Sequence, residues 1–260
     1  MMDISFIIVI FLIGFVGSFI SGMVGIGGSI IKYPMLLYIP PLLGVATFTS
    51  HEVAGISAVQ VFFATIAGVW AYKSSGYLNM RLIAYMGGAI LIGSLIGGYG
   101  SEFLTETQID IVYAILATIA VVMMFLPKKE IPFSPGDDLQ FNGPLAAGLA
   151  LITGAAAGIV GAAGAFILVP IMLVVLKIPT RVTIATSLAV TFISSIGATI
   201  GKVVTDQVLY GPAVIMIVAS LLAAPLGAKA GQNMNTKVLQ WILALIILGT
   251  AIKIWTEVVM

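Results

Sequence analysis

Apolar residues follow one another along most of this chain in stretches as long as a membrane helix, separated by short polar segments. In the first half these stretches lie at 4–38, 46–72, 81–99 and 108–126, and the second half has the same pattern. A helix needs about 20 apolar residues to cross a bilayer. The pattern therefore predicts an all-α polytopic protein that crosses the lipid bilayer several times.

Glycine interrupts the first apolar stretch. Residues 21–34 read SGMVGIGGSIIKYP and contain four glycines and a proline, the two residue types that weaken helices most. The segment before the cluster, from Ile4 to Ile20, is about 25 Å long as a helix. The two arms are therefore either short tilted helices or the arms of a re-entrant hairpin, and the sequence leaves this open.

The same interruption occurs twice. Residues 158–170 read GIVGAAGAFILVP and share the pattern G-x-V-G-x-x-G-x5-P with residues 22–34, which lie 136 positions earlier. A Thr-Ser pair at 49–50 recurs at 186–187, 137 positions later. Internal duplication is the usual construction of secondary transporters. The sequence therefore predicts a first membrane repeat at 1–126, a polar linker at 127–144 and a second membrane repeat at 145–260.

The basic residues favour a reversal of the chain at each glycine cluster. With reversals, eight Lys and Arg residues fall on one side of the membrane and two on the other; without them, the division is six to four. Cytoplasmic loops are enriched in Lys and Arg, which favours the first arrangement. We therefore expect two inverted repeats, each with a Gly-broken or re-entrant first segment followed by three helices, and about 8 to 10 membrane segments in all.

Composition excludes several classes of function. Hydrophobic residues make up 60% of the 260 residues and charged residues 8%, and a formal net charge of +1 gives no basis for binding nucleic acid. The chain has no cysteine and one histidine, which excludes disulfides and metal sites built from cysteine or several histidines. We expect no metal and no cofactor. The sequence does not predict the oligomeric state.

A helix break inside the bilayer indicates a site for an anion. The break leaves backbone groups without helical partners, which is tolerated only against protein or a water-filled cavity. The arm after each break begins at the positive end of a helix dipole, and glycine lets a ligand approach the backbone closely. The candidate substrate-binding positions at the breaks are Gly22, Gly25, Gly27, Gly28, Ser29, Gly158, Gly161 and Gly164.

Polar side chains near the breaks are further candidates. The two Thr-Ser pairs offer hydroxyl donors to an anion, or they bond their own helix backbone. Lys32, copied as Leu168, either neutralises the anion or extends to the membrane interface. Gln60 contacts either the substrate or a neighbouring helix. These candidates for substrate binding are Lys32, Thr49, Ser50, Gln60, Thr186 and Ser187.

His51 and Glu52 are the candidates for proton coupling. Their copies are Leu188 and Ala189, so the second half lacks both ionisable groups. An ionisable residue in a membrane segment costs about 2.5–3.5 kcal/mol to insert and is a functional candidate by default. Histidine also titrates near physiological pH. The alternative places both residues at a helix end, where Glu52 is favourable to the N-terminal dipole.

The duplicated G-x-V-G-x-x-G-x5-P pattern, followed by a Thr-Ser pair on a chain with almost no polar loops, resembles the sulfite exporter TauE/SafE family, also described as the TSUP permeases. The resemblance covers the chain from about Gly14 to the end. It implies a multi-pass permease of the cell (plasma or inner) membrane for sulfur-containing anions such as sulfite, sulfonates or sulfoacetate. One departure is GAAGA at 161–165, where the family tends to carry three adjacent glycines. We expect transport by alternating access, coupled to the proton gradient.

Two other classes of function remain open. A passive anion channel also uses a polar site near the middle of the membrane. An intramembrane enzyme needs a nucleophile with a base and an orienting partner, or a metal, and the sequence contains neither a G-x-S-x-G nor an H-E-x-x-H motif. We therefore expect that the protein is not an enzyme.

Overall fold

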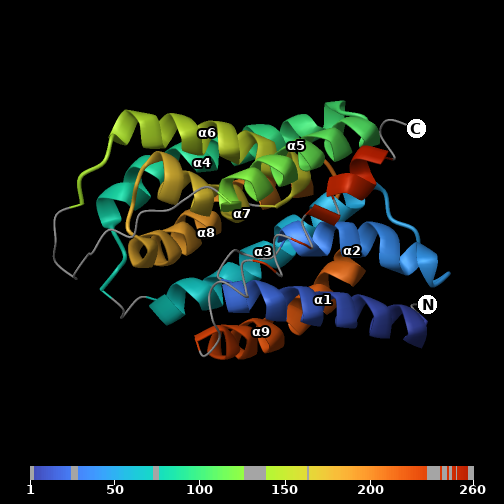
Figure 1. Ribbon diagram of the computed structural model, residues 1–260. Coiled ribbons are helices and arrows are strands. Elements are labelled where there is room, and N and C mark those ends of the chain that lie inside the picture. Colours follow the sequence, from blue (N-terminus) through green and yellow to red (C-terminus); the bar gives the residue numbers. More distant parts are fainter. Residues whose placement is uncertain are drawn as a thin grey trace.

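The computed structural model describes residues 3–24, 29–72, 76–125, 139–162, 164–232, 241, 245, 248–249 and 251–256, and every regular element within them is helical (Figure 1). A 3₁₀ turn at Ser101–Phe103 follows α4, and a π-helical turn at Ile171–Val175 follows α7. Residues 251–256 are also helical. The labelled helices are α1 (Ile4–Val24), α2 (Ser29–Leu42), α3 (Ser50–Tyr72), α4 (Met80–Gly100), α5 (Glu106–Phe125), α6 (Gly143–Val160), α7 (Ala165–Pro170), α8 (Thr180–Val204) and α9 (Tyr210–Gln232).

Six helices in this part of the chain are long and apolar enough to cross a membrane, namely α1, α4, α5, α6, α8 and α9. This confirms the prediction of an all-helical, multi-pass membrane protein. Helix α8 is the most enclosed of the six, because 67% of the residues in its span are buried, against 33–44% in the others. Helix α8 therefore lies in the interior of the bundle.

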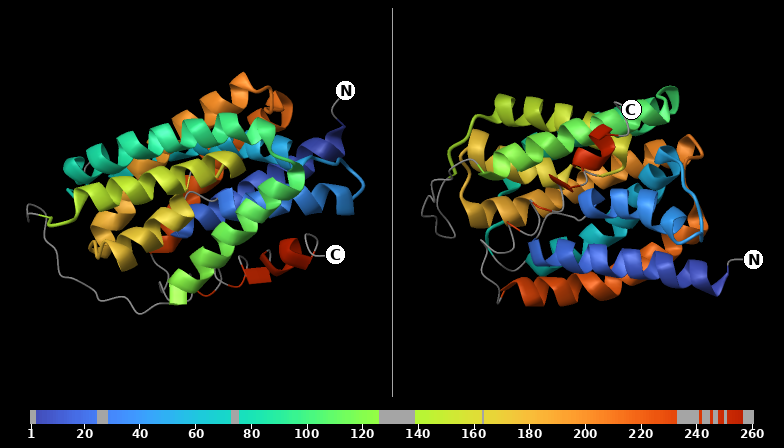
Figure 2. Two further views of the ribbon diagram at one scale, coloured as in Figure 1. Left: turned by 90° about the horizontal axis from the view of Figure 1, so that it is seen from above. Right: turned by 45° about the vertical axis from the view of Figure 1, so that its right-hand side comes forward.

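Helices α1 and α2 form a hairpin. The chain reverses after α1, and α2 returns toward the end of the bundle that holds the N-terminus (Figures 1 and 2). The ring of Phe6, near the start of α1, lies 6.3 Å from the ring of Phe48, which follows α2. The two arms thus begin and end at the same end of the bundle.

Helices α6 and α7 form a second hairpin. Asn142 caps the start of helix α6, because its side chain accepts a hydrogen bond from the Leu145 N–H at 3.1 Å. Gly161 follows the last residue of α6 and has the left-handed φ of +71° typical of a glycine after a helix. The amide of Ala162 then bonds back to the carbonyl of Ala157 at 2.9 Å. The helix break predicted in the second half is therefore a capped helix C-terminus, followed by the short helix α7.

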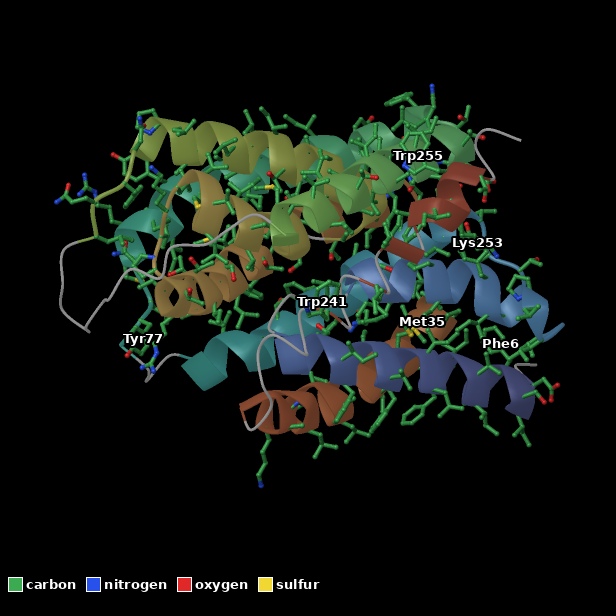
Figure 3. The ribbon with its side chains drawn as sticks, viewed as in Figure 1. Phe6, Met35, Tyr77, Trp241, Lys253 and Trp255 are labelled. Carbon is green, nitrogen blue, oxygen red and sulfur yellow. The ribbon has the colours of Figure 1, made fainter. Side chains whose placement is uncertain are left out.

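The second hairpin opens toward the other end of the bundle. The chain enters this hairpin beside the start of α4: the guanidinium of Arg81 in α4 lies 5.6 Å from the ring centre of Phe141, which precedes α6. The segment that follows the hairpin also reaches this end of the bundle, because Arg181, at the start of α8, donates a hydrogen bond to the hydroxyl of Tyr77 at 2.9 Å. Figure 3 shows Tyr77 at the end of the bundle opposite to Phe6.

The helices pack in two groups around α3 and α8. Helix α1 packs along α9, while α4 packs along both α6 and α8. Buried apolar residues form one cluster centred on α1, α2, α3 and α5 and a second centred on α4, α6, α7 and α8. Helices α3 and α8 also contact each other directly, with the rings of Phe62 and Phe192 stacked 5.6 Å apart. The two central helices thus join the two groups.

Glycines allow the backbones of α4 and α6 to touch. A Cβ on Gly158 of α6 would overlap the carbonyl oxygen of Ser94 in α4, and one on Gly97 of α4 would overlap that of Ala155 in α6. Close approach through small residues is a common mode of helix association in membranes.

We expect Gly158→Ala to lower the free energy of unfolding by about 1–3 kcal/mol, because the added methyl group meets backbone that must move. Thermal unfolding of the purified protein in detergent measures the change. Gly148→Ala is the matched control, since the same change on α6 meets nothing within 4 Å. Equal melting temperatures for the two variants would contradict the packing role of Gly158.

Candidate functional site

The glycines of the first break lie mostly outside the described residues. Gly25, Gly27 and Gly28 are not described, and neither is the side chain of Ser29, the first residue of α2. Gly22 lies in the last turn of α1. Their proposed contact with substrate stays a prediction.

The glycines of the second break pack against protein. A Cβ on Gly161 would overlap the carbonyl oxygen of Ala54 in α3, so this break rests directly on the backbone of a central helix. Gly164, with φ +71°, faces Thr153 and Ala157 of α6, and Gly158 faces α4. The structure thus gives each of these three glycines a packing role, and substrate contact there also stays a prediction.

Lys32 is the buried charge next to the first break. It lies in the first turn of α2, and its side chain is 1% exposed. Its stem packs against α1 at Gly17, where a Cβ would overlap the Cγ of Lys32. The chain thus places a lysine side chain inside the bundle, and the absence of a side chain at Gly17 leaves room for it.

Gln60 of α3 is the partner of Lys32. The Lys32 Nζ donates a hydrogen bond to the Gln60 Oε1 at 2.6 Å, although the residues are 28 positions apart. Gln60 is fully buried, and its Nε2 has no hydrogen-bond partner in the part of the chain that the structure describes. The contact therefore fixes the amide with its oxygen toward the lysine and leaves its NH₂ group unpaired.

The electrostatics of this pair favour an anion. A buried ammonium is costly unless a charge of opposite sign compensates it, and in the described residues Lys32 bonds only to a neutral amide. Its remaining N–H groups and the NH₂ of Gln60 are all donors. An acceptor with negative charge satisfies both requirements at once. The structure thus brings together two of the side chains that the sequence predicted to bind substrate.

The candidates at the start of α3 form a helix cap. The Thr49 N–H donates to the Glu52 Oε2 at 2.9 Å, and the Glu52 N–H donates to the Thr49 Oγ1 at 3.2 Å. This reciprocal pair is a capping box, which stabilises the first turn of a helix. The His51 Nε2 lies 3.1 Å from the carbonyl oxygen of Ser101. The structure thus favours the helix-end alternative for Glu52, and proton coupling stays a prediction.

Ser50 belongs to a different polar cluster, which sequence analysis missed. The hydroxyls of Ser50 and Tyr33 both donate to the Asp110 Oδ1 at 2.9 Å, and the ring of Tyr33 stacks on that of Tyr113 at 4.7 Å. Asp110 is an acidic residue inside the apolar span of α5, which is the signal that the sequence offered. This cluster links α2 to α3 and α5. Its α2 member, Tyr33, is the residue that follows Lys32 in the chain.

The copied pair in the second half has other partners. The hydroxyl of Thr186 accepts a hydrogen bond from the Asn79 N–H at 3.2 Å, and that of Ser187 donates to the carbonyl of Ile184 at 3.2 Å. Asn79 precedes α4 and lies beside Tyr77, at the end of the bundle far from Phe6. The four candidate hydroxyls are therefore not brought into one site.

A second buried lysine lies at the end of α8. Lys202 is fully buried, and its Nζ donates to the Ser101 Oγ and to the Gln207 Oε1, both at 2.7 Å. Gln207 in turn donates to the hydroxyl of Thr205 at 2.9 Å. A cation in the last turn of a helix also interacts favourably with the helix dipole. Lys202 thus joins the end of α8 to the turns that follow α4 and α8.

The chain is similar in sequence to known membrane proteins. The family model described as Sulfite exporter TauE/SafE matches residues 10–254. The chain is 22% identical to the "Probable membrane transporter protein YunE" of Bacillus subtilis, over 94% of this chain and 95% of the relative. It is 24% identical to a "Probable membrane transporter protein" of Xylella fastidiosa, over 93% of this chain and 91% of the relative. No solved structure matches.

We expect Tyr33→Phe to lower the free energy of unfolding by about 1.5–3 kcal/mol, because it removes a hydrogen bond to a carboxylate and keeps the ring stack. Thermal unfolding in detergent measures the loss. Tyr210→Phe is the control, since that side chain is 60% exposed. A Tyr33→Phe protein as stable as the control would show that the Asp110 cluster does not hold α2 in place.

Proposed function

Because this chain belongs to the sulfite exporter TauE/SafE family, we propose that it is a permease for small sulfur-containing anions such as sulfite, sulfonates or sulfoacetate. The observation that carries the proposal is the buried ammonium of Lys32 with its neutral partner Gln60. A bound anion compensates the charge of Lys32 and accepts hydrogen bonds from both side chains. The N-terminal dipole of α2, in whose first turn Lys32 lies, adds to this attraction.

The membrane fold consists, in this proposal, of two inverted repeats at 1–126 and 145–260, joined by the linker at 127–144. The packing of α1 along α9 corresponds, after a shift of one repeat, to the packing of α6 along α4. The two hairpins open toward opposite ends of the bundle, as the ring contact of Phe6 with Phe48 and the hydrogen bond of Arg181 to Tyr77 indicate. These pairings support an inverted duplication around α3 and α8.

The charge of the site belongs to the first repeat only. The positions equivalent to Lys32 and Gln60 are Leu168 and Gly197. Leu168 lies in the apolar cluster with Val190, and Gly197 packs against α4. This asymmetry supports one anion for each protein chain. Alternating access then exposes the anion to each side of the membrane in turn, with proton coupling through His51 and Glu52 as part of the proposal.

We expect Lys32→Met to reduce the saturable uptake of sulfite or methanesulfonate into proteoliposomes by roughly 100-fold or more, because one partner of a buried charged contact is removed. Lys229→Gln, on the exposed part of α9, is the control and keeps its flux. An imposed proton gradient, applied to wild type and to His51→Ala, tests the coupling in the same assay.

Full flux in folded Lys32→Met protein would overturn the assignment of the site. Flux that rises in proportion to anion concentration without saturation would indicate a passive channel instead.

We expect Gln60→Glu to abolish stabilisation of the protein by added methanesulfonate, because the new carboxylate pairs with Lys32 and takes the place of the anion. Melting temperatures in detergent, measured with and without the anion, report this. Gln60→Leu is the comparison: it removes the hydrogen-bond partner of Lys32, lowers the melting temperature and keeps a gain on addition of anion. A Gln60→Glu protein that the anion still stabilises as strongly as wild type would contradict the proposal.

A further inference from the structure

Ser57 of α3 carries a buried hydroxyl without a partner. Its side chain is 1% exposed, and its Oγ has no hydrogen-bond partner in the part of the chain that the structure describes. Hydroxyls in helices usually bond a carbonyl of the preceding turn, as Thr65 does with Val61 at 2.8 Å and Ser195 with Phe192 at 2.6 Å. Buried polar groups are rarely left unpaired, so a missing partner needs an explanation.

The position of Ser57 on α3 offers an explanation for its missing hydrogen-bond partner. Ser57 precedes Gln60 by three residues on α3, a spacing that places two side chains next to each other on a helix surface. The NH₂ group of Gln60 is unpaired as well, and its orientation is held by Lys32. Two adjacent unpaired groups and an ammonium therefore lie within a short stretch of α3 and the start of α2.

We propose that Ser57 is the third donor of the anion site and that it makes the site selective for anions with three oxygens over carboxylates with two. This inference rests on the proposed function, because it takes Lys32 and Gln60 as the first two donors. A sulfonate has an oxygen for each of the three side chains. The two oxygens of a carboxylate lie in one plane, so a carboxylate whose oxygens face Lys32 and Gln60 directs no third oxygen at Ser57, whose hydroxyl then stays buried and unpaired.

The second repeat offers a matched control. Ser194 of α8 lies 137 positions after Ser57, is fully buried, and its hydroxyl is also without a partner in the described residues. The positions around it equivalent to Lys32 and Gln60 hold Leu168 and Gly197, which carry no donor side chain. Removal of either hydroxyl makes the same change in the same kind of helix. Only the Ser57 change lies next to the charged pair.

The experiment measures binding of methanesulfonate and of acetate to the purified full-length protein by calorimetry, at a pH where both are ionised. For wild type we expect methanesulfonate to bind roughly 10-fold to 100-fold more tightly, the value of one hydrogen bond to a charged group. Ser57→Ala weakens methanesulfonate binding by a similar factor and leaves acetate within about 3-fold of wild type, so that the preference disappears. Ser194→Ala keeps both affinities. Thermal unfolding establishes that each variant is folded.

The outcomes separate this inference from the proposed function. If Lys32→Met abolishes binding but Ser57→Ala keeps the preference for methanesulfonate, the role of Ser57 is wrong and the anion site stands. If wild type binds the two anions equally, the inference is also wrong. Equal losses in Ser57→Ala and Ser194→Ala would show an effect of packing and overturn it. If Lys32→Met binds as wild type does, the proposed function itself fails.

Discussion

The constraint on which the rest of this structure depends is that backbone groups inside a bilayer must be covered by protein or by water. Each hairpin ends a helix within the bundle, and the second break meets this requirement by lying on α3, with Gly161 against the carbonyl of Ala54. Glycine is needed there both for its positive φ and for the absence of a side chain. Helix α3 is therefore the surface on which the second broken segment rests.

Inside the bundle, the charge of a lysine interacts strongly with its few polar neighbours. In water a lysine and a neutral amide interact weakly, but inside the bundle an ammonium has few alternatives to its immediate neighbours. Lys32 reaches Gln60 only because Gly17 of α1 leaves room for its stem. The site is thus assembled by three helices that are apolar over most of their length, and its polarity is concentrated in a few atoms. In the proposed function, such concentration favours a small anion over charged ligands in general.

Residues at matching positions in the two halves make different contacts. The Thr-Ser pair in the first half caps α3 and bonds Asp110, whereas its copy accepts a bond from Asn79 and returns to its own helix. Lys32 and Leu168 likewise occupy matching positions, one in a polar contact and the other in an apolar cluster. A duplicated sequence pattern therefore indicates common architecture, while chemistry depends on the neighbours that each copy meets.

The sequence by itself determined that the protein is helical and membrane-embedded, where its helices break, and the family to which it belongs, because hydrophobic runs and glycine clusters act locally along the chain. It also named Lys32 and Gln60 as candidates. Only the tertiary structure decided that these two side chains meet, that Asp110 accepts from Tyr33 and Ser50, and that Gly158 and Gly161 pack against other helices. Those contacts join residues on different helices, and their pairing depends on how the helices rotate and approach, which no local pattern records.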